Sequence, residues 1–283
     1  MAQGIEEGEL MNKLTSEDFI QFLAQVWEDA PAFHTFSTVN SKIKGNLDNG
    51  NCFKVKSLFE CLELYQWNSK GYYENKNELK LLSHQLHEAL TTNNTGETGR
   101  LFKEIYRWGG VRLQTKGDPN VSQFWLEQNI KTDTLVQKIN ASVEIVFNGE
   151  GLGRFDGHDL IMNSGFTKVV SLASKHKREL IIFDGRVGAA LGHLVVMAVK
   201  MGGYTDISDE LLFPWGTAQS KHINRNPSNE IIKFPRLFGG NRSHFKHASA
   251  MSASSSMVRS VSTELNIDPR DFEAALFMWG YSV

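Results

Sequence analysis

The stretch MNSGFTKVVSLASKHKRELIIFDGRVGAAL, residues 162–191, contains the two most informative side chains of this protein, Lys168 and Asp184. A turn at 163–165 leads into a predicted helix that carries Lys168, and the basic cluster Lys175 to Arg178 ends that helix. The apolar segment Leu180 to Phe183 then brings the chain to Asp184, at the start of a strongly apolar helix predicted over 184–200. Because Lys168 and Asp184 are about one helix and its return loop apart, we expect both side chains to face one cleft.

The chemistry of this pair follows from their surroundings. A carboxylate at a helix N-terminus is held by backbone N–H groups and favoured by the helix dipole, so Asp184 is expected to stay ionised. It can then stabilise a cation that develops on a sugar, or polarise an attacking nucleophile. An amine with a lowered pKa can attack such a carbon and form a Schiff base. The plainer alternatives are that Asp184 only caps its helix and that Lys168 is a solvated lysine.

The window resembles the helix-hairpin-helix DNA glycosylases, and more narrowly their 8-oxoguanine glycosylase-like bacterial branch. The matching segments are Thr167-Lys168-Val169 and Phe183-Asp184-Gly185-Arg186-Val187. Weaker likeness extends to the segments 107–111, 212–216 and 274–281, mostly after residue 100. The hairpin before the lysine reads Ser164-Gly165-Phe166, where the family usually has Gly-apolar-Gly.

The resemblance implies a mainly α fold, a DNA partner and cleavage of an N-glycosidic bond after the nucleotide is flipped out of the duplex. Asp184 would be the catalytic carboxylate and Lys168 the nucleophile, which would add lyase activity. Trp108, Gly109 and Trp215 are assigned to the base pocket. The residues assigned to DNA contact are Ser164, Gly165, Arg186, Arg225, Arg236 and Arg242. No organic cofactor and no metal are implied.

Some bacterial relatives of this kind remove bulky modified bases from phage DNA, so glucosylated hydroxymethylcytosine is the substrate that the resemblance favours, in antiviral defence. One alternative is a repair glycosylase and lyase that acts on 8-oxoguanine. Another is a DNA-binding module that keeps the fold without catalysis. The sequence does not distinguish the base, because selectivity depends on loops that the pattern does not place.

Charge is distributed unevenly along a chain whose net charge is −2. Between Arg154 and Arg259 there are 14 Lys and Arg residues against 8 Asp and Glu. Such a basic half is typical of a face that binds a polyanion, and it is equally compatible with a solvated surface whose counter-charges lie on the other half.

Cysteine usage and hydropathy exclude several other classes of protein. The only two cysteines, Cys52 and Cys61, form no CxxC pair, and His84 and His87 lack a HExxH glutamate, so a zinc site is not expected. No stretch reaches the roughly 18 apolar residues of a membrane span. The acidic, polar N-terminus does not resemble a signal peptide, so we expect a cytoplasmic protein.

The chain divides, by these patterns, into a helical N-terminal region over 1–100 and a helix-hairpin-helix glycosylase-like core over 101–283. Helices are expected over 15–29, 53–65, 79–90 and 101–106, two more within 121–139, and a closing one over 263–278. The run 91–98 is predicted to be a flexible loop, 158–176 a helix–turn–helix, and 202–247 a loop-like tract. The unmatched N-terminal region is a candidate for holding the substrate preference.

Overall fold

The computed structural model describes residues 12–37, 47–48, 52–115, 118–174, 178–218, 223–238 and 242–283. These residues form a mainly helical protein with little sheet, which confirms the predicted fold class at that level. Among the residues described, no helix combines the length and apolar character that crossing a bilayer requires.

The N-terminal part alternates short strands with two helices. Its elements are β1 (Lys13–Leu14), α1 (Ser16–Glu28), β2 (His34–Ser37), β3 (Leu47–Asp48), β4 (Cys52–Val55), α2 (Leu58–Glu63), β5 (Gln66–Trp67) and β6 (Lys70–Gly71). The helix expected over 15–29 is confirmed as α1, which begins with a capping box between Thr15 and Asp18. The helix expected over 53–65 is wrong in its first part, because Phe53 lies in β4 and Ser57 caps a shorter helix.

The middle of the chain is almost entirely helical. It contains α3 (Tyr72–Thr91), α4 (Thr95–Trp108), β7 (Gln114–Thr115), β8 (Asp118–Pro119), α5 (Val121–Lys131), α6 (Leu135–Asn148), the 3-10 turn η1 (Leu152–Arg154) and α7 (Phe166–Ala173). The predicted loop over 91–98 is wrong, because Asn94 caps α4 through the Glu97 N–H and shortens the connection to three residues. The helix–turn–helix expected over 158–176 reduces, within the described residues, to the single helix α7.

The C-terminal part contains α8 (Gly185–Gly202), β9 (Asp206–Ile207), the 3-10 turn η3 (Asp209–Leu211), α9 (Ser243–Leu265) and α10 (Pro269–Trp279). Helix α9 was not predicted, because its many serines mask an apolar periodicity. Several of these hydroxyls donate back to the carbonyl four residues earlier, as Ser254 does to Ala250, so they are satisfied within the helix. The closing helix expected over 263–278 is divided in the structure, because α9 ends at Leu265 and α10 begins at Pro269.

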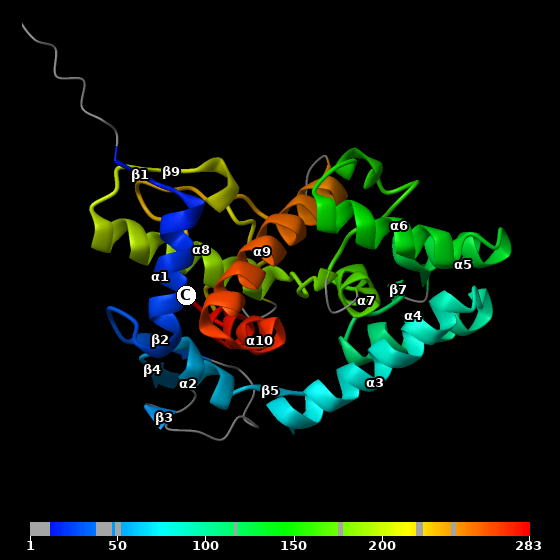
Figure 1. Ribbon diagram of the computed structural model, residues 1–283, viewed down its shortest axis with the longest axis horizontal. Helices are drawn as coiled ribbons and strands as arrows, with labels where there is room; N and C mark the ends of the chain where they lie inside the picture. Colours follow the sequence, from blue (N-terminus) through cyan, green and yellow to red (C-terminus); the bar gives the residue numbers. More distant parts are fainter. Residues whose placement is uncertain are drawn as a thin grey trace, which may run out of the picture.

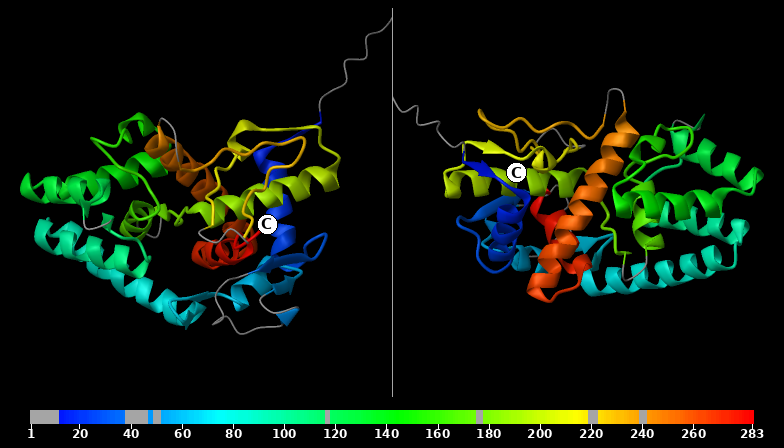
Figure 2. Two further views of the ribbon diagram at one scale, coloured as in Figure 1. Left: turned by 180° about the vertical axis from the view of Figure 1, so that it is seen from behind. Right: turned by 45° about the horizontal axis from the view of Figure 1, so that its top comes forward.

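The elements gather into two groups with α9 and α10 between them (Figure 1). One group holds α4, α5, α6 and α7, and the other holds α1, α2 and the small sheets, as the turned views also show (Figure 2). The sheets are small. Strand β1 pairs in parallel with β9. An antiparallel sheet has the strand order β2-β4-β3, and β5–β6 and β7–β8 are hairpins. Helix α3 links the groups, since it packs against α4 and α7 in the first group and against the β5–β6 hairpin in the second.

The first turn of α8 lies directly against the end of α10. A Cβ built on Gly280 would lie 1.9 Å from the Arg186 carbonyl oxygen and 2.9 Å from the Ala190 nitrogen, so only glycine permits this approach. Gly185 makes a similar approach to Gly216, whose N–H donates to the Gly185 carbonyl over 3.2 Å. These backbone contacts bring α8, α10 and the segment around Gly216 together at one point.

Replacing Gly280 with alanine is expected to lower the free energy of unfolding by about 2–3 kcal/mol, because a new methyl group would overlap backbone atoms that cannot move aside. Chemical denaturation measures this change. Gly153→Ala is the matched control, since no atom lies within 4 Å of its added Cβ. A Gly280→Ala protein as stable as the control would show that the two helices are not in this close contact.

Candidate functional site

A cavity of about 500 Å³ opens where α3, α7, α8 and α10 converge. Its wall includes residues from both predicted regions of the chain. The side chains on which its chemistry depends are Tyr65, Trp67, Asn75, Trp108, Lys168, Asp184, Arg186, Arg225, Arg270, Glu273, Phe277 and Tyr281. The cavity thus contains both members of the predicted catalytic pair.

Asp184 is the N-cap of α8, as the sequence predicts. Its Oδ1 accepts hydrogen bonds from the backbone N–H groups of Arg186 (2.9 Å) and Val187 (3.2 Å). Burial alone would raise the pKa of this carboxyl, but the positive charges of Lys168 and Arg186 and the two N–H groups outweigh it and hold the pKa below its ordinary value. Asp184 therefore lines the cavity as a carboxylate at neutral pH.

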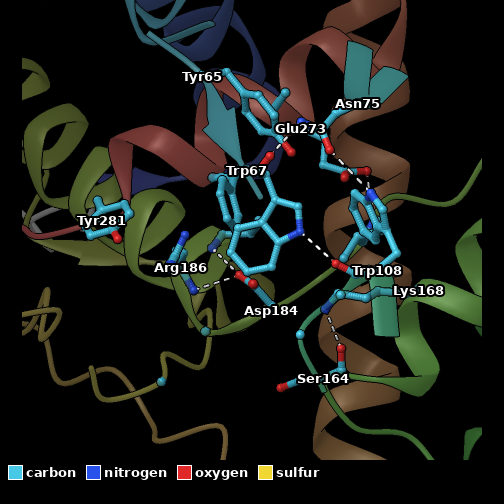
Figure 3. Close-up of a pocket in the computed structure, with 18 of the residues that line it drawn as sticks. Tyr65, Trp67, Asn75, Trp108, Ser164, Lys168, Asp184, Arg186, Glu273 and Tyr281 are labelled. Atoms are coloured by element: carbon cyan, nitrogen blue, oxygen red, sulfur yellow. Dashed lines mark hydrogen bonds between the residues drawn. The ribbon is translucent and has the colours of Figure 1, made fainter. Parts of the chain in front are cut away.

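Lys168 is not a solvated helix lysine, because only 6% of its surface is exposed. It extends from the first turn of α7, and its Nζ donates to the Ser164 carbonyl over 2.6 Å (Figure 3). Burial lowers the pKa of this amine, while the nearby carboxylates of Asp184 and Glu273 oppose the change. A buried lysine with a lowered pKa is a better nucleophile at neutral pH than an exposed one.

The turn before α7 holds the lysine more directly than it offers a phosphate site. The Asn163 Oδ1 accepts the N–H groups of Gly165 (2.9 Å) and Phe166 (3.0 Å), so these donors are already occupied within the turn. Ser164 lines the cavity and supplies the carbonyl to Lys168. Gly165 is required for packing, since an added Cβ would lie 2.3 Å from the Tyr106 ring.

Two tryptophans form an aromatic wall of the cavity. Trp108 is only 8% exposed, and its indole N–H donates to the Asn75 Oδ1 over 3.3 Å. Its carbonyl accepts the Trp67 indole N–H at 2.9 Å, which fixes the second ring beside the first (Figure 3). Gly109 also lines this wall. A Cβ added to it would lie 2.4 Å from the aliphatic part of the Lys168 side chain, so glycine leaves room for that side chain.

Arg186 lies among aromatic rings rather than on the outer surface. The centre of its guanidinium group is 4.2 Å from the Tyr281 ring centroid, 4.3 Å from that of Phe277 and 5.6 Å from that of Trp67. These distances are typical of cation–π contacts. Its Nη1 is buried and has no hydrogen-bond partner among the described residues. Arg186 therefore adds a positive charge to the cavity wall.

The remaining predicted residues are placed differently from one another. Trp215 does not line the cavity, because its indole N–H donates to the Phe234 carbonyl over 3.3 Å and Arg236 covers its ring. Its neighbour Gly216 lines the wall instead. Arg225 lines the cavity and donates to the Tyr281 carbonyl over 3.0 Å. Arg236 and Arg242 are exposed and lie outside it.

Sequence reasoning missed Glu273, a second carboxyl in the cavity that is 7% exposed. Its Oε2 accepts from the Ile182 N–H (2.8 Å) and from Arg270 Nη1 (2.5 Å). Burial raises the pKa of Glu273 to about 7, although the charge of Arg270 opposes the rise. Glu273 precedes Phe277 by four residues on the closing helix, so the helical spacing alone places the two side chains on one face. That spacing was the signal in the sequence.

Trp67 was also missed, although a local pattern marks its position. Asn68 and Ser69 both have positive φ, 52° and 65°, between the strands of the β5–β6 hairpin. Asparagine at such a two-residue turn is a recognised hairpin signal. The turn directs Trp67 toward Trp108, so the N-terminal region contributes to the cavity wall.

Within the described segments, no three His, Cys, Asp or Glu residues are grouped so that they could hold a metal ion. Comparison with protein-family models, with curated proteins and with solved structures gives no significant match. What the site does is therefore inferred from its own geometry.

The coupling of Lys168 to Asp184 is measurable without any substrate. Replacing Asp184 with asparagine removes a negative charge that favours the ammonium form, so the pKa of Lys168 is expected to fall further. Reductive methylation across a range of pH, read by peptide mass spectrometry, measures the pH at which Lys168 is half reactive. That pH should move down in Asp184→Asn, while labelling of the exposed Lys80 stays the same. An unchanged midpoint at Lys168 would mean that the two groups do not interact.

Proposed function

We propose that the protein is a DNA glycosylase that removes a modified base after flipping its nucleotide into the cavity around Asp184. The observation that carries this proposal is the pairing, in one cavity, of a carboxylate kept ionised and a buried lysine with a lowered pKa. The resemblance of 162–191 to helix-hairpin-helix glycosylases agrees with this assignment.

The aromatic wall suits the first step of such a reaction. A base that leaves the duplex loses its stacking, and aromatic side chains in the pocket restore part of that energy. Trp67 and Trp108 are fixed by hydrogen bonds, and Phe277 lies on the facing helix. The pocket is therefore preorganised for a flat ring system.

The chemical step would be divided between two residues. As the C1′–N bond lengthens, positive charge develops on the deoxyribose, and Asp184 stabilises that charge. The neutral amine of Lys168 then forms a bond to C1′, which leads to an imine and to strand cleavage by elimination. If water attacks in its place, the product is an abasic site alone.

The size of the cavity favours a base with a large substituent. At about 500 Å³ it lies within the range of pockets that hold drug-sized ligands, which leaves room beyond a single pyrimidine ring. Lys76, Arg225 and Arg270 add polar and charged groups to its wall. Glucosylated hydroxymethylcytosine, whose hexose carries several hydroxyl groups, is the substrate we propose, with defence against phage as the setting.

Purified protein should release a base from glucosylated hydroxymethylcytosine DNA in a panel that also contains unmodified, uracil, 8-oxoguanine and hydroxymethylcytosine duplexes. Alkaline cleavage reads the abasic sites. Asp184→Asn should lower the rate at least roughly 100-fold, because the amide still caps α8 but carries no charge. Asp156→Asn is the matched control, since the Asp156 Oδ1 likewise accepts two backbone N–H groups and the residue lies outside this cavity.

Each outcome of that panel separates the alternatives. Activity on 8-oxoguanine alone would assign the protein to repair and reject the glucosylated substrate. DNA binding without abasic sites on any duplex would make it a non-catalytic module. Borohydride should trap the wild-type protein on the cleaved DNA, and loss of trapping in Lys168→Met would identify the nucleophile.

Arg236 and Arg242, which are exposed and lie outside the cavity, are proposed to contact phosphates. Arg236→Ala and Arg242→Ala should each weaken binding to all duplexes alike and reduce the slope of log affinity against log salt by about 1. Fluorescence anisotropy at several salt concentrations measures the slope. Arg100→Ala is the control, because Arg100 pairs with Glu97 and Glu104 on α4. A slope equal to that of the control would exclude these arginines from the DNA interface.

A further inference from the structure

We propose that Glu273 is the general acid of this site, and that it passes a proton from its Oε1 to the departing base. This inference rests on the proposed function and assigns the one buried carboxyl of the cavity wall, among the described residues, that the mechanism above leaves unused. Two carboxyl groups in one cavity would then have different roles, because their surroundings favour different protonation states.

The hydrogen bonds of Glu273 leave a specific oxygen for the proton. Oε2 accepts from the Ile182 N–H and from Arg270, so a proton on the carboxyl belongs on Oε1. The side chain lies on α10 one turn before Phe277, and both residues line the cavity. A base held against Phe277 would therefore meet Glu273 on the same face of the helix.

Burial and the surrounding charges together give Glu273 a raised pKa, whereas that of Asp184 is lowered. Arg270 on the same helix and Lys168 on α7 favour the carboxylate, whereas Asp184 and Glu179 oppose it by repulsion. The phenols of Tyr65 and Tyr72 also interact with it, and burial raises the pKa of both. Burial is the largest influence on Glu273 and raises its pKa to about 7, so the protonated form of this carboxyl is accessible near neutral pH.

The proposed step balances in atoms and charge. The C1′–N bond breaks, its electron pair moves onto the base, and the proton of Glu273 joins a ring nitrogen or exocyclic oxygen of that base. The base leaves as a neutral molecule, and the sugar cation faces the Asp184 carboxylate. The Lys168 amine or a water then forms the new bond to C1′ and releases a proton to solvent. Glu273 is left as a carboxylate, for which the Ile182 N–H and Arg270 are already in place.

Single-turnover release of the base from glucosylated hydroxymethylcytosine DNA, measured on both sides of pH 7, tests this role. In the wild-type protein the rate should fall as pH rises through about 7, because the acid loses its proton. Glu273→Gln should be at least roughly 100-fold slower below that pH, and its rate should no longer fall above it. Glu273→Asp, which keeps a carboxyl group, should have part of the wild-type rate, and its rate should again decrease as pH rises.

Glu144→Gln is the matched control, because Glu144 is an exposed carboxyl that pairs with Arg178 away from the cavity. If Glu273 is purely structural, Glu273→Gln will lower the rate equally at every pH, and the rate will still decrease above pH 7. That result would overturn the proposal. A Glu273→Gln variant that releases the base as fast as the wild-type protein would also overturn the proposal, but it would leave the glycosylase function intact. A wild-type protein that releases no base from any duplex would instead remove the proposed function itself.

Discussion

The close approach of backbone at the start of α8 is the constraint on which the site depends. Gly280 at the end of α10 lies against the Arg186 carbonyl, and Gly185 lies against Gly216. A side chain at either glycine would push these segments apart. Since Asp184 precedes this contact and Glu273 lies on α10, the same packing that joins the helices also brings two carboxyl groups into one cavity.

Burial then gives each charged group of the cavity its own chemistry. Asp184 keeps its charge because the helix N-terminus, Lys168 and Arg186 compensate for desolvation. For Lys168 and Glu273, nearby opposite charges compensate less completely for desolvation, so burial favours the neutral form of each side chain more than water does. A lysine with a lowered pKa, an ionised carboxylate and a carboxyl group with a raised pKa can thus coexist within one pocket.

The local patterns of the sequence predicted a large part of the fold. The helix that follows Thr15 and the apolar helix that follows Asp184 are both present in the structure. The errors arose where a local rule competed with packing. Helix α9 escaped prediction because serine is typical of loops, whereas here its hydroxyls bond within the helix. Phe53 looked helical by spacing but pairs in β4.

The sequence by itself determined the mainly helical class, the position of Asp184 at a helix N-terminus and the candidate pair that it forms with Lys168. Only the tertiary structure decided which side chains share the cavity. It placed Trp108 on the wall and Trp215 outside it, and it added Trp67 and Glu273 from distant parts of the chain. The physical reason is that capping and periodicity act over a few residues, whereas a cavity wall is set by contacts between helices far apart in sequence.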